Sequence, residues 1–152
     1  MWGHTHDQYY STYQSVTNPS KTIGVGQVGA SGTTYENDNP SYALIDIDAE
    51  TLLPVNYRIF AFDLAEANAN GDVQPNWRQF TDYAQDYGLA GGVSTDSLYD
   101  LAVRVSQDKD LYEQFAWDKT RRAGSKPIST DFDWDGRSQF CHLTTIGDKQ
   151  FN

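Results

Sequence analysis

The first half of the chain alternates between apolar and polar positions with a period of two, which is typical of β-strands with one solvated face. Ala43, Ile45 and Ile47 lie on one side of an extended segment, and a second alternating run covers residues 55–64. The polar segment 48–51 separates the two runs. Two alternating runs joined by a short polar segment predict an antiparallel hairpin.

Two earlier segments are also strand-like. An aromatic and polar run covers residues 8–13, a glycine-rich run covers 22–30, and a turn at 17–20 lies between them. Aromatic and β-branched side chains favour strands, and Asn, Pro and Ser favour turns. Residues 31–41 are rich in Gly, Thr and Asn, so we expect a loop there.

The second half changes to helical spacing. Asn76 is a good capping residue, and we expect a first helix from there to Gly88, after a polar linker at 68–75. Its apolar face would consist of Trp77, Phe80, Ala84 and Tyr87.

Two further helices begin at strong capping residues. Ser94 precedes an apolar stripe that ends at Val105, and Asp108 precedes a stripe that includes Phe115. Residues 137–146 predict a short fourth helix. The expected fold class is therefore α+β, with a strand-rich first half and a helical second half.

The composition excludes several classes of protein. The chain has 152 residues, with 11 Lys and Arg against 21 Asp and Glu, and a formal net charge of −10. That length fits one domain, and the negative charge repels phosphate backbones and anionic membranes, so we expect no nucleic-acid polymer as a partner. No apolar run approaches the ~20 residues of a membrane span. The single cysteine, Cys141, excludes a disulfide within this chain.

The densest candidate chemistry lies in the tetrapeptide Gly-His-Thr-His at residues 3–6. In an extended segment, side chains two residues apart point to the same side, so His4 and His6 can face one site. Histidine is a common zinc ligand, and two histidines can each serve one ion of a two-metal phosphoesterase centre. The alternative is a pair of solvated histidines. Such chemistry at the N-terminus favours a fragment of a longer protein over a complete small protein with a metal-binding N-terminus.

Three other features have simpler interpretations. The Gly-x-Gly-x-x-Gly pattern at residues 24–29 precedes no helical pattern, so a glycine-rich strand is favoured over dinucleotide binding. Asp131, Asp133 and Asp135 begin like a calcium loop, but His142 stands where a bidentate glutamate belongs. An acidic loop between helices is the favoured reading there, with calcium binding as the alternative. Cys141 is interpreted as a packing residue.

Several short motifs then follow one another in a characteristic order. They lie at residues 3–6, 33–35, 39–42, 45–46, 63–68, 75–77 and 87–89. In this order they resemble the C-terminal part of acid sphingomyelinase and the acid sphingomyelinase-like phosphodiesterases, which are calcineurin-like metallophosphoesterases. The resemblance implies that residues 1–64 form the last strands of a metallophosphoesterase domain and that residues 65–152 form a helical C-terminal subdomain.

The resemblance also implies a function. His4 would ligate one zinc ion and His6 the other, and Tyr35 would contact substrate, although a solvated loop tyrosine is the alternative for Tyr35. The full-length enzyme would hydrolyse a phosphodiester, such as sphingomyelin or a nucleotide, with metal-activated water, and would be secreted or lysosomal. The remaining zinc ligands would lie in an N-terminal catalytic region of the same protein. No catalytic residue is assigned within this chain, so we expect the isolated fragment to be inactive.

Two departures from the family pattern leave another function open. Gln8 stands where the family usually has aspartate, and Cys141 is the single cysteine in a region that is cysteine-rich in the family. The alternative function is a noncatalytic binding module that uses the aromatic side chains of the first half. Its candidate contact residues are Tyr9, Tyr10, Tyr13 and Tyr35.

Overall fold

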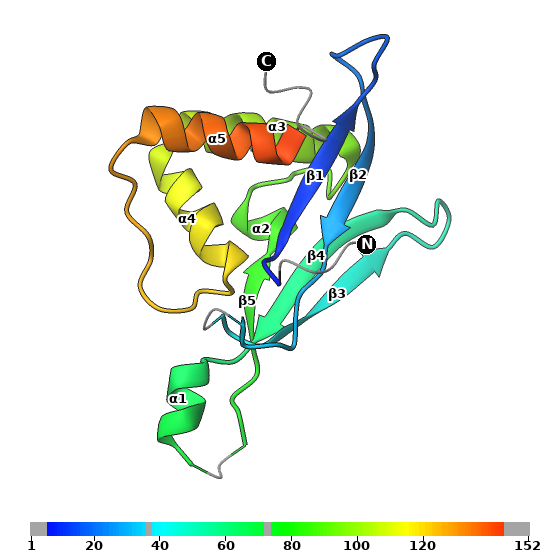
Figure 1. Ribbon diagram of the computed structural model, residues 1–152. Coiled ribbons are helices and arrows are strands. Elements are labelled where there is room, and N and C mark those ends of the chain that lie inside the picture. The colour runs from blue at the N-terminus through cyan, green and yellow to red at the C-terminus, as the bar shows by residue number, and fades with distance from the viewer. Residues whose placement is uncertain (1–5, 36–37, 72–73, 145–152) are drawn as a thin grey trace.

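A computed structural model describes residues 6–35, 38–71 and 74–144 of the chain (Figure 1). Strands predominate in the first half and helices in the second, so the predicted α+β class is confirmed. The strands are β1 (Tyr9–Gln14), β2 (Thr22–Val28), β3 (Ser41–Ile47), β4 (Pro54–Ala61) and β5 (Arg78–Asp82). The helices are α1 (Leu64–Ala69), α2 (Tyr83–Asp86), α3 (Thr95–Gln107), α4 (Lys109–Lys119) and α5 (Phe132–Thr144).

The strands form two antiparallel sheets. Strands β1 and β2 form a hairpin in which Tyr10 pairs with Gln27. Strands β3, β4 and β5 form a three-stranded sheet with β4 in the centre, and Ile45 pairs with Tyr57. The predicted hairpin around residues 48–51 is therefore confirmed, and the Gly-x-Gly-x-x-Gly pattern lies largely within β2, as expected for a glycine-rich strand.

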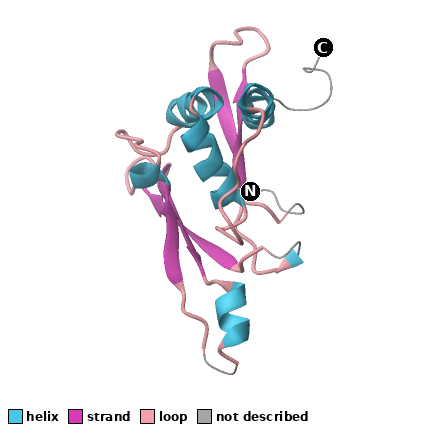
Figure 2. Ribbon diagram, turned by 90° about the vertical axis from the view of Figure 1, so that its left-hand side faces the viewer, coloured by secondary structure: helices cyan, strands magenta, loops and turns pink. Residues whose placement is uncertain are grey.

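The core lies between the β1–β2 hairpin and the helices. Helices α3 and α5 pack against each other and against this hairpin, while α1 lies at the opposite end of the molecule (Figures 1 and 2). Tyr10 is fully buried, and its hydroxyl donates a hydrogen bond of 2.8 Å to the carbonyl of Leu98. The other core side chains include Leu101, Val105, Phe115 and Leu143. Burial of these apolar groups is the main favourable contribution to folding.

The predicted helix from Asn76 to Gly88 is wrong. Residues 78–82 form β5, which pairs with β4 through Ile59 and Thr81, and a helix begins only at Tyr83. The carboxylate of Asp82 caps α2 by accepting a hydrogen bond of 3.1 Å from the backbone of Gln85. Pairing with a neighbouring strand has overridden the local helical spacing.

The predicted linker also begins inside a helix, because α1 covers Leu64–Ala69. Asp63 caps α1 and accepts a hydrogen bond of 2.9 Å from the backbone of Glu66. The predicted caps of α3 and α4 are confirmed, since Ser94 accepts from Ser97 and Asp108 accepts from Leu111.

The last described helix begins earlier than expected, and the predicted acidic loop is wrong. Helix α5 begins at Phe132, and Asp131 precedes it. The Asp131 carboxylate accepts a hydrogen bond of 3.3 Å from the backbone of Trp134. Gly136 lies against the carbonyl of Ser106 in α3, so close packing of the two helices favours helix over loop in this segment. Among the helices that the structure describes, none is both long and apolar enough to cross a membrane.

Candidate metal-binding site

The structure brings together two of the three predicted site residues. The ring centroids of His6 and Tyr35 are 5.3 Å apart, and the rings meet edge to face at 87°. Tyr35 is 61% exposed, so its ring is accessible from solvent while it contacts the imidazole. His4 lies outside the described residues. The structure therefore places the predicted metal ligand His6 beside the predicted substrate-contact residue Tyr35.

One nitrogen of the His6 imidazole is a candidate metal ligand. Its Nδ1 atom is buried and forms no hydrogen bond within the described part of the chain. A buried polar atom of this kind normally has a partner, and an imidazole nitrogen can take a metal ion as that partner. The geometry of His6 is therefore compatible with the predicted role as a metal ligand.

The backbone at His6 is held by a buried arginine. The side chain of Arg121 is 0% exposed, and its Nη1 atom donates a hydrogen bond of 2.5 Å to the carbonyl of His6. Its Nε atom donates a hydrogen bond of 2.9 Å to the carbonyl of Asn39. Its Nη2 atom forms an ion pair of 3.1 Å with Asp38. The guanidinium of Arg121 thus joins the backbone of His6 to the loop before β3.

Two opposing effects act on the pKa of Arg121. Burial lowers the pKa of Arg121, whereas the carboxylates of Asp38 and Asp7 act in the opposite direction. Arginine has an intrinsic pKa above 12, so the guanidinium stays charged and keeps all its donors. Arg121 also has a φ of +53°, a left-handed conformation that is uncommon outside glycine and that is retained where surrounding contacts determine it.

Residues 7 and 8 also contact the C-terminal end of α4. The backbone of Gln8 donates a hydrogen bond of 2.9 Å to the carbonyl of Lys119, whose Nζ atom lies 3.6 Å from Asp7. The side-chain amide of Asn39 donates to the carbonyl of Arg121 at 3.0 Å, and its Oδ1 atom accepts from the backbone of Leu64 at 2.9 Å. The placement of residues 6–8 and of Asn39 therefore depends on residues from both halves of the chain.

Sequence reasoning assigned no role in the site to Arg121. An arginine near a helix end is usually solvated, and the signal available was the adjacent pair Arg121 and Arg122 near the C-terminal end of the expected third helix. Asn39 belongs to the motif at residues 39–42, and in the structure its side chain bridges Arg121 and Leu64. These functions depend on contacts between distant segments, which spacing along the sequence does not reveal.

The described residues contain no group of three or more His, Cys, Asp or Glu side chains arranged to hold a metal ion. Asp133 and Asp135 lie within α5, and Asp135 accepts a hydrogen bond of 2.7 Å from the hydroxyl of Ser129. The loop geometry of the calcium alternative is therefore not present. The aromatic residues of the alternative binding module do not form one surface, because Tyr10 lies in the core whereas Tyr35 is exposed.

Cys141 and His142 both belong to α5, where Cys141 is a half-buried free thiol and His142 is exposed. The carbonyl of His142 accepts a hydrogen bond of 3.3 Å from the hydroxyl of Ser11.

The comparisons with known proteins point to one class of hydrolase. No protein-family model matches this sequence. Sphingomyelin phosphodiesterase A of Dictyostelium discoideum is 32% identical over 153 residues, which cover 100% of this chain and 25% of that protein. Sphingomyelin phosphodiesterase of Bos taurus is 27% identical over 119 residues, which cover 76% of this chain and 19% of that protein. Sphingomyelin phosphodiesterase B of Dictyostelium discoideum is 34% identical over 122 residues, which cover 76% of this chain and 18% of that protein.

These similarities confirm the predicted relationship to sphingomyelin phosphodiesterases of the acid sphingomyelinase type. The chain spans a quarter or less of the length of the curated relatives described above.

Proposed function

We propose that this chain is the C-terminal part of a zinc-dependent phosphodiesterase of the sphingomyelinase type, in which His4 and His6 each ligate one of two zinc ions. The observation that carries the proposal is the buried Nδ1 atom of His6, which lies beside Tyr35 and has no hydrogen-bond partner among the residues that the structure describes. Similarity to a sphingomyelin phosphodiesterase over the whole chain supports it. The substrate would be a phosphodiester, either sphingomyelin or a nucleotide derivative, and the enzyme would be secreted or lysosomal.

In this proposal the chain positions ligands and shapes the substrate cleft. Zinc ions supply water activation and neutralise charge on the phosphate oxygens. Arg121 fixes the carbonyl of His6 and so limits the directions in which the imidazole can point. Tyr35 would present its exposed edge to the substrate. Residues 1–64 would complete the metallophosphoesterase domain, and residues 65–152 would form the helical subdomain beside it.

A zinc ion in a catalytic site needs three protein ligands and an open position. Two histidines cannot provide these for two ions, so the remaining ligands would come from an N-terminal region of the complete protein. The relatives are at least four times as long as the segment they share with this chain, which leaves room for such a region.

The test uses the complete protein that contains this chain, with the single substitutions His4→Ala and His6→Ala. Each should reduce the bound zinc by one ion per protein and lower the rate of phosphodiester hydrolysis at least ~100-fold, because each removes a ligand of the reacting centre. Zinc content is measured by atomic emission and hydrolysis with a chromogenic phosphodiester.

The matched control is His142→Ala, which removes the third histidine of the chain from an exposed position on α5. This variant should keep its zinc and its activity. Full zinc content and full activity in both the His4 and the His6 variants would contradict the proposal.

A further inference from the structure

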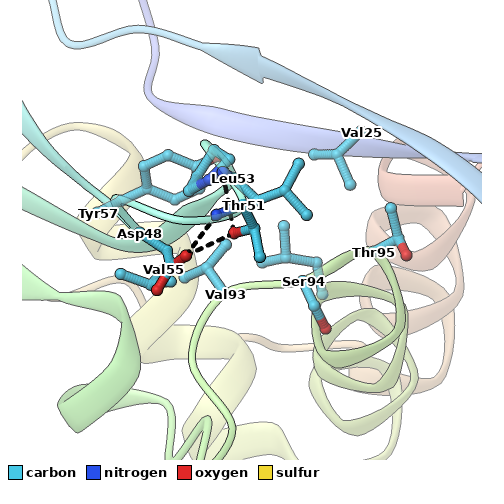
Figure 3. Close-up of a pocket in the computed structure, with 11 residues that line it drawn as sticks. Val25, Asp48, Thr51, Leu53, Val55, Tyr57, Val93, Ser94 and Thr95 are labelled. Carbon is cyan, nitrogen blue, oxygen red and sulfur yellow. Dashed lines mark hydrogen bonds between the residues drawn. The ribbon is translucent and has the colours of Figure 1, made fainter.

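A cavity of about 600 Å³ lies between β2, the start of β4 and the N-terminal end of α3 (Figure 3). Its volume falls within the range of about 300–1,000 Å³ that is usual for small-molecule sites. Its walls are mainly apolar and include Val25, Leu53, Val55, Tyr57, Val93 and Leu98. The cavity is distinct from the histidine segment, since neither His6 nor Tyr35 lines it.

Backbone contacts hold two of the walls together. The backbone of Val93 donates a hydrogen bond of 2.8 Å to the carbonyl of Val55, which joins the loop before α3 to β4. Gly92 has a φ of +78°, and a Cβ atom there would lie 2.8 Å from the same carbonyl. This junction is closely packed and Val93 and Leu98 are buried, so the fold itself holds these walls of the cavity in place.

The rim of the cavity is also apolar. Leu53 is 62% exposed and Val55 is 39% exposed, although both line the cavity. Exposed apolar side chains around a preformed apolar cavity are a feature of ligand sites, because a ligand removes their surface from water. A hydrocarbon chain matches these walls, since it has no polar groups that would be left without hydrogen bonds.

A carboxylate marks one side of the same rim. Asp48 lines the cavity, and its Oδ1 atom accepts hydrogen bonds from the backbone and the hydroxyl of Thr51, at 2.7 and 2.8 Å. The backbone of Glu50 adds a third hydrogen bond of 3.1 Å. These bonds lower the pKa of Asp48, so the group is ionised at neutral pH. A negative charge here attracts a cationic headgroup and repels a fatty-acid carboxylate.

We propose that this cavity binds the hydrocarbon chain of an amphiphile whose cationic headgroup lies beside Asp48. The inference goes beyond the proposed phosphodiesterase activity, because binding here involves no hydrolysis and neither of the candidate zinc ligands. The site would hold an amphiphile whether or not the histidine segment binds metal.

Calorimetric titration of the 152-residue chain with octyl- and decyltrimethylammonium, below their micelle concentrations, tests the proposal. Two extra buried methylenes at ~0.8 kcal/mol each correspond to about 15-fold tighter binding of the decyl probe. Decanoate has a hydrocarbon chain of similar length and the opposite charge, so it should bind more weakly than the decyl cation. Asp48→Asn keeps the Oδ1 acceptor of the turn and should remove most of that preference.

Neighbouring leucines provide a matched pair of variants. Leu53→Ser removes an apolar group from the rim and should weaken binding of the decyl probe about tenfold. Leu52→Ser changes the adjacent leucine, which is 74% exposed and does not line the cavity, and should change binding less than twofold. Val25→Phe fills the cavity from β2 and should also weaken binding at least tenfold.

Three results would overturn the inference. One is the absence of saturable binding of the decyl probe, and another is equal weakening by Leu53→Ser and Leu52→Ser. The third is self-association of the unliganded chain that Leu53→Ser abolishes in sedimentation measurements, because a second copy of the chain would then be the occupant. None of these results bears on the histidine variants, so the two proposals fail independently.

Discussion

Arg121 shows how a single side chain can connect distant parts of this protein. Its guanidinium lies in the interior and contacts the carbonyls of His6 and Asn39 and the carboxylate of Asp38. A buried charge is tolerated where it is paired and hydrogen-bonded, and the planar guanidinium provides donors in several fixed directions. A lysine has the same charge but cannot reach these acceptors together.

We therefore expect Arg121→Lys to lower the free energy of unfolding by about 2–4 kcal/mol, because buried acceptors lose their donors. Urea denaturation followed by circular dichroism measures the change. Arg137→Lys is the control, since Arg137 is exposed on α5, and it should change stability by less than about 0.5 kcal/mol. Equal effects of the two substitutions would show that the buried contacts of Arg121 contribute little.

For single residues, the sequence indicated which side chains carry candidate chemistry but not where the fold places them. His6 and Tyr35 were singled out from motifs, and the structure places their rings in contact. Nothing in the sequence indicates that Arg121 is buried, because an arginine near the end of an expected helix is usually solvated. Its role becomes visible only when the fold brings residues 38–39 next to the end of α4.

Among the elements, the close contact between α3 and α5 depends on one glycine. A Cβ atom at Gly136 would lie 2.8 Å from the carbonyl oxygen of Ser106 and 3.2 Å from Cε2 of Phe132. The first of these neighbours is backbone of α3, so the helices would have to separate to accept even a methyl group.

Gly136→Ala should consequently lower the free energy of unfolding by about 1–2 kcal/mol, because the overpacking exceeds the gain in helix propensity. Thermal unfolding measured by calorimetry tests this expectation. Gly91→Ala serves as the control, because a Cβ atom there meets no atom within 4 Å, and its stability should be unchanged or slightly higher. A stabilised Gly136→Ala variant would mean that α5 can shift without cost.

Element predictions succeeded where local signals were strong. The caps at Ser94 and Asp108 were predicted because their side chains satisfy backbone donors within the same turn. The helix expected from Asn76 failed because residues 78–82 pair with β4, a contact that no local pattern encodes. The spacing of Trp77 and Phe80, three residues apart, places both side chains on one face of a helix, whereas in the structure Trp77 precedes β5 and Phe80 lies within it.

For the whole molecule, the order of strands and then helices was predictable because each half has its own period of apolar residues. The relationship to sphingomyelin phosphodiesterases was predicted from motifs spread along the chain and is confirmed. The cavity beside α3 was not predictable, since its walls come from β2, from the segment around Asp48 and β4, and from α3. The assignment of residues 1–64 and 65–152 to two structural units stays a prediction.

The isolated 152-residue chain should show no zinc-dependent hydrolysis of a chromogenic phosphodiester above the rate of buffer with zinc. Its two candidate ligands leave each ion short of the three protein ligands that a catalytic zinc requires. The measurement is a rate assay with added zinc, accompanied by a circular dichroism spectrum that verifies folding. Hydrolysis that saturates with substrate and disappears on chelation would contradict this expectation.

The bond between Arg121 and the carbonyl of His6 has a genetic corollary. If His6 is a zinc ligand as proposed, substitutions just after the C-terminal end of α4 would weaken zinc binding without touching the metal. A loss-of-function screen of the intact enzyme would then recover changes at residue 121 that resemble those at residue 6, although the two positions are separated by most of the chain.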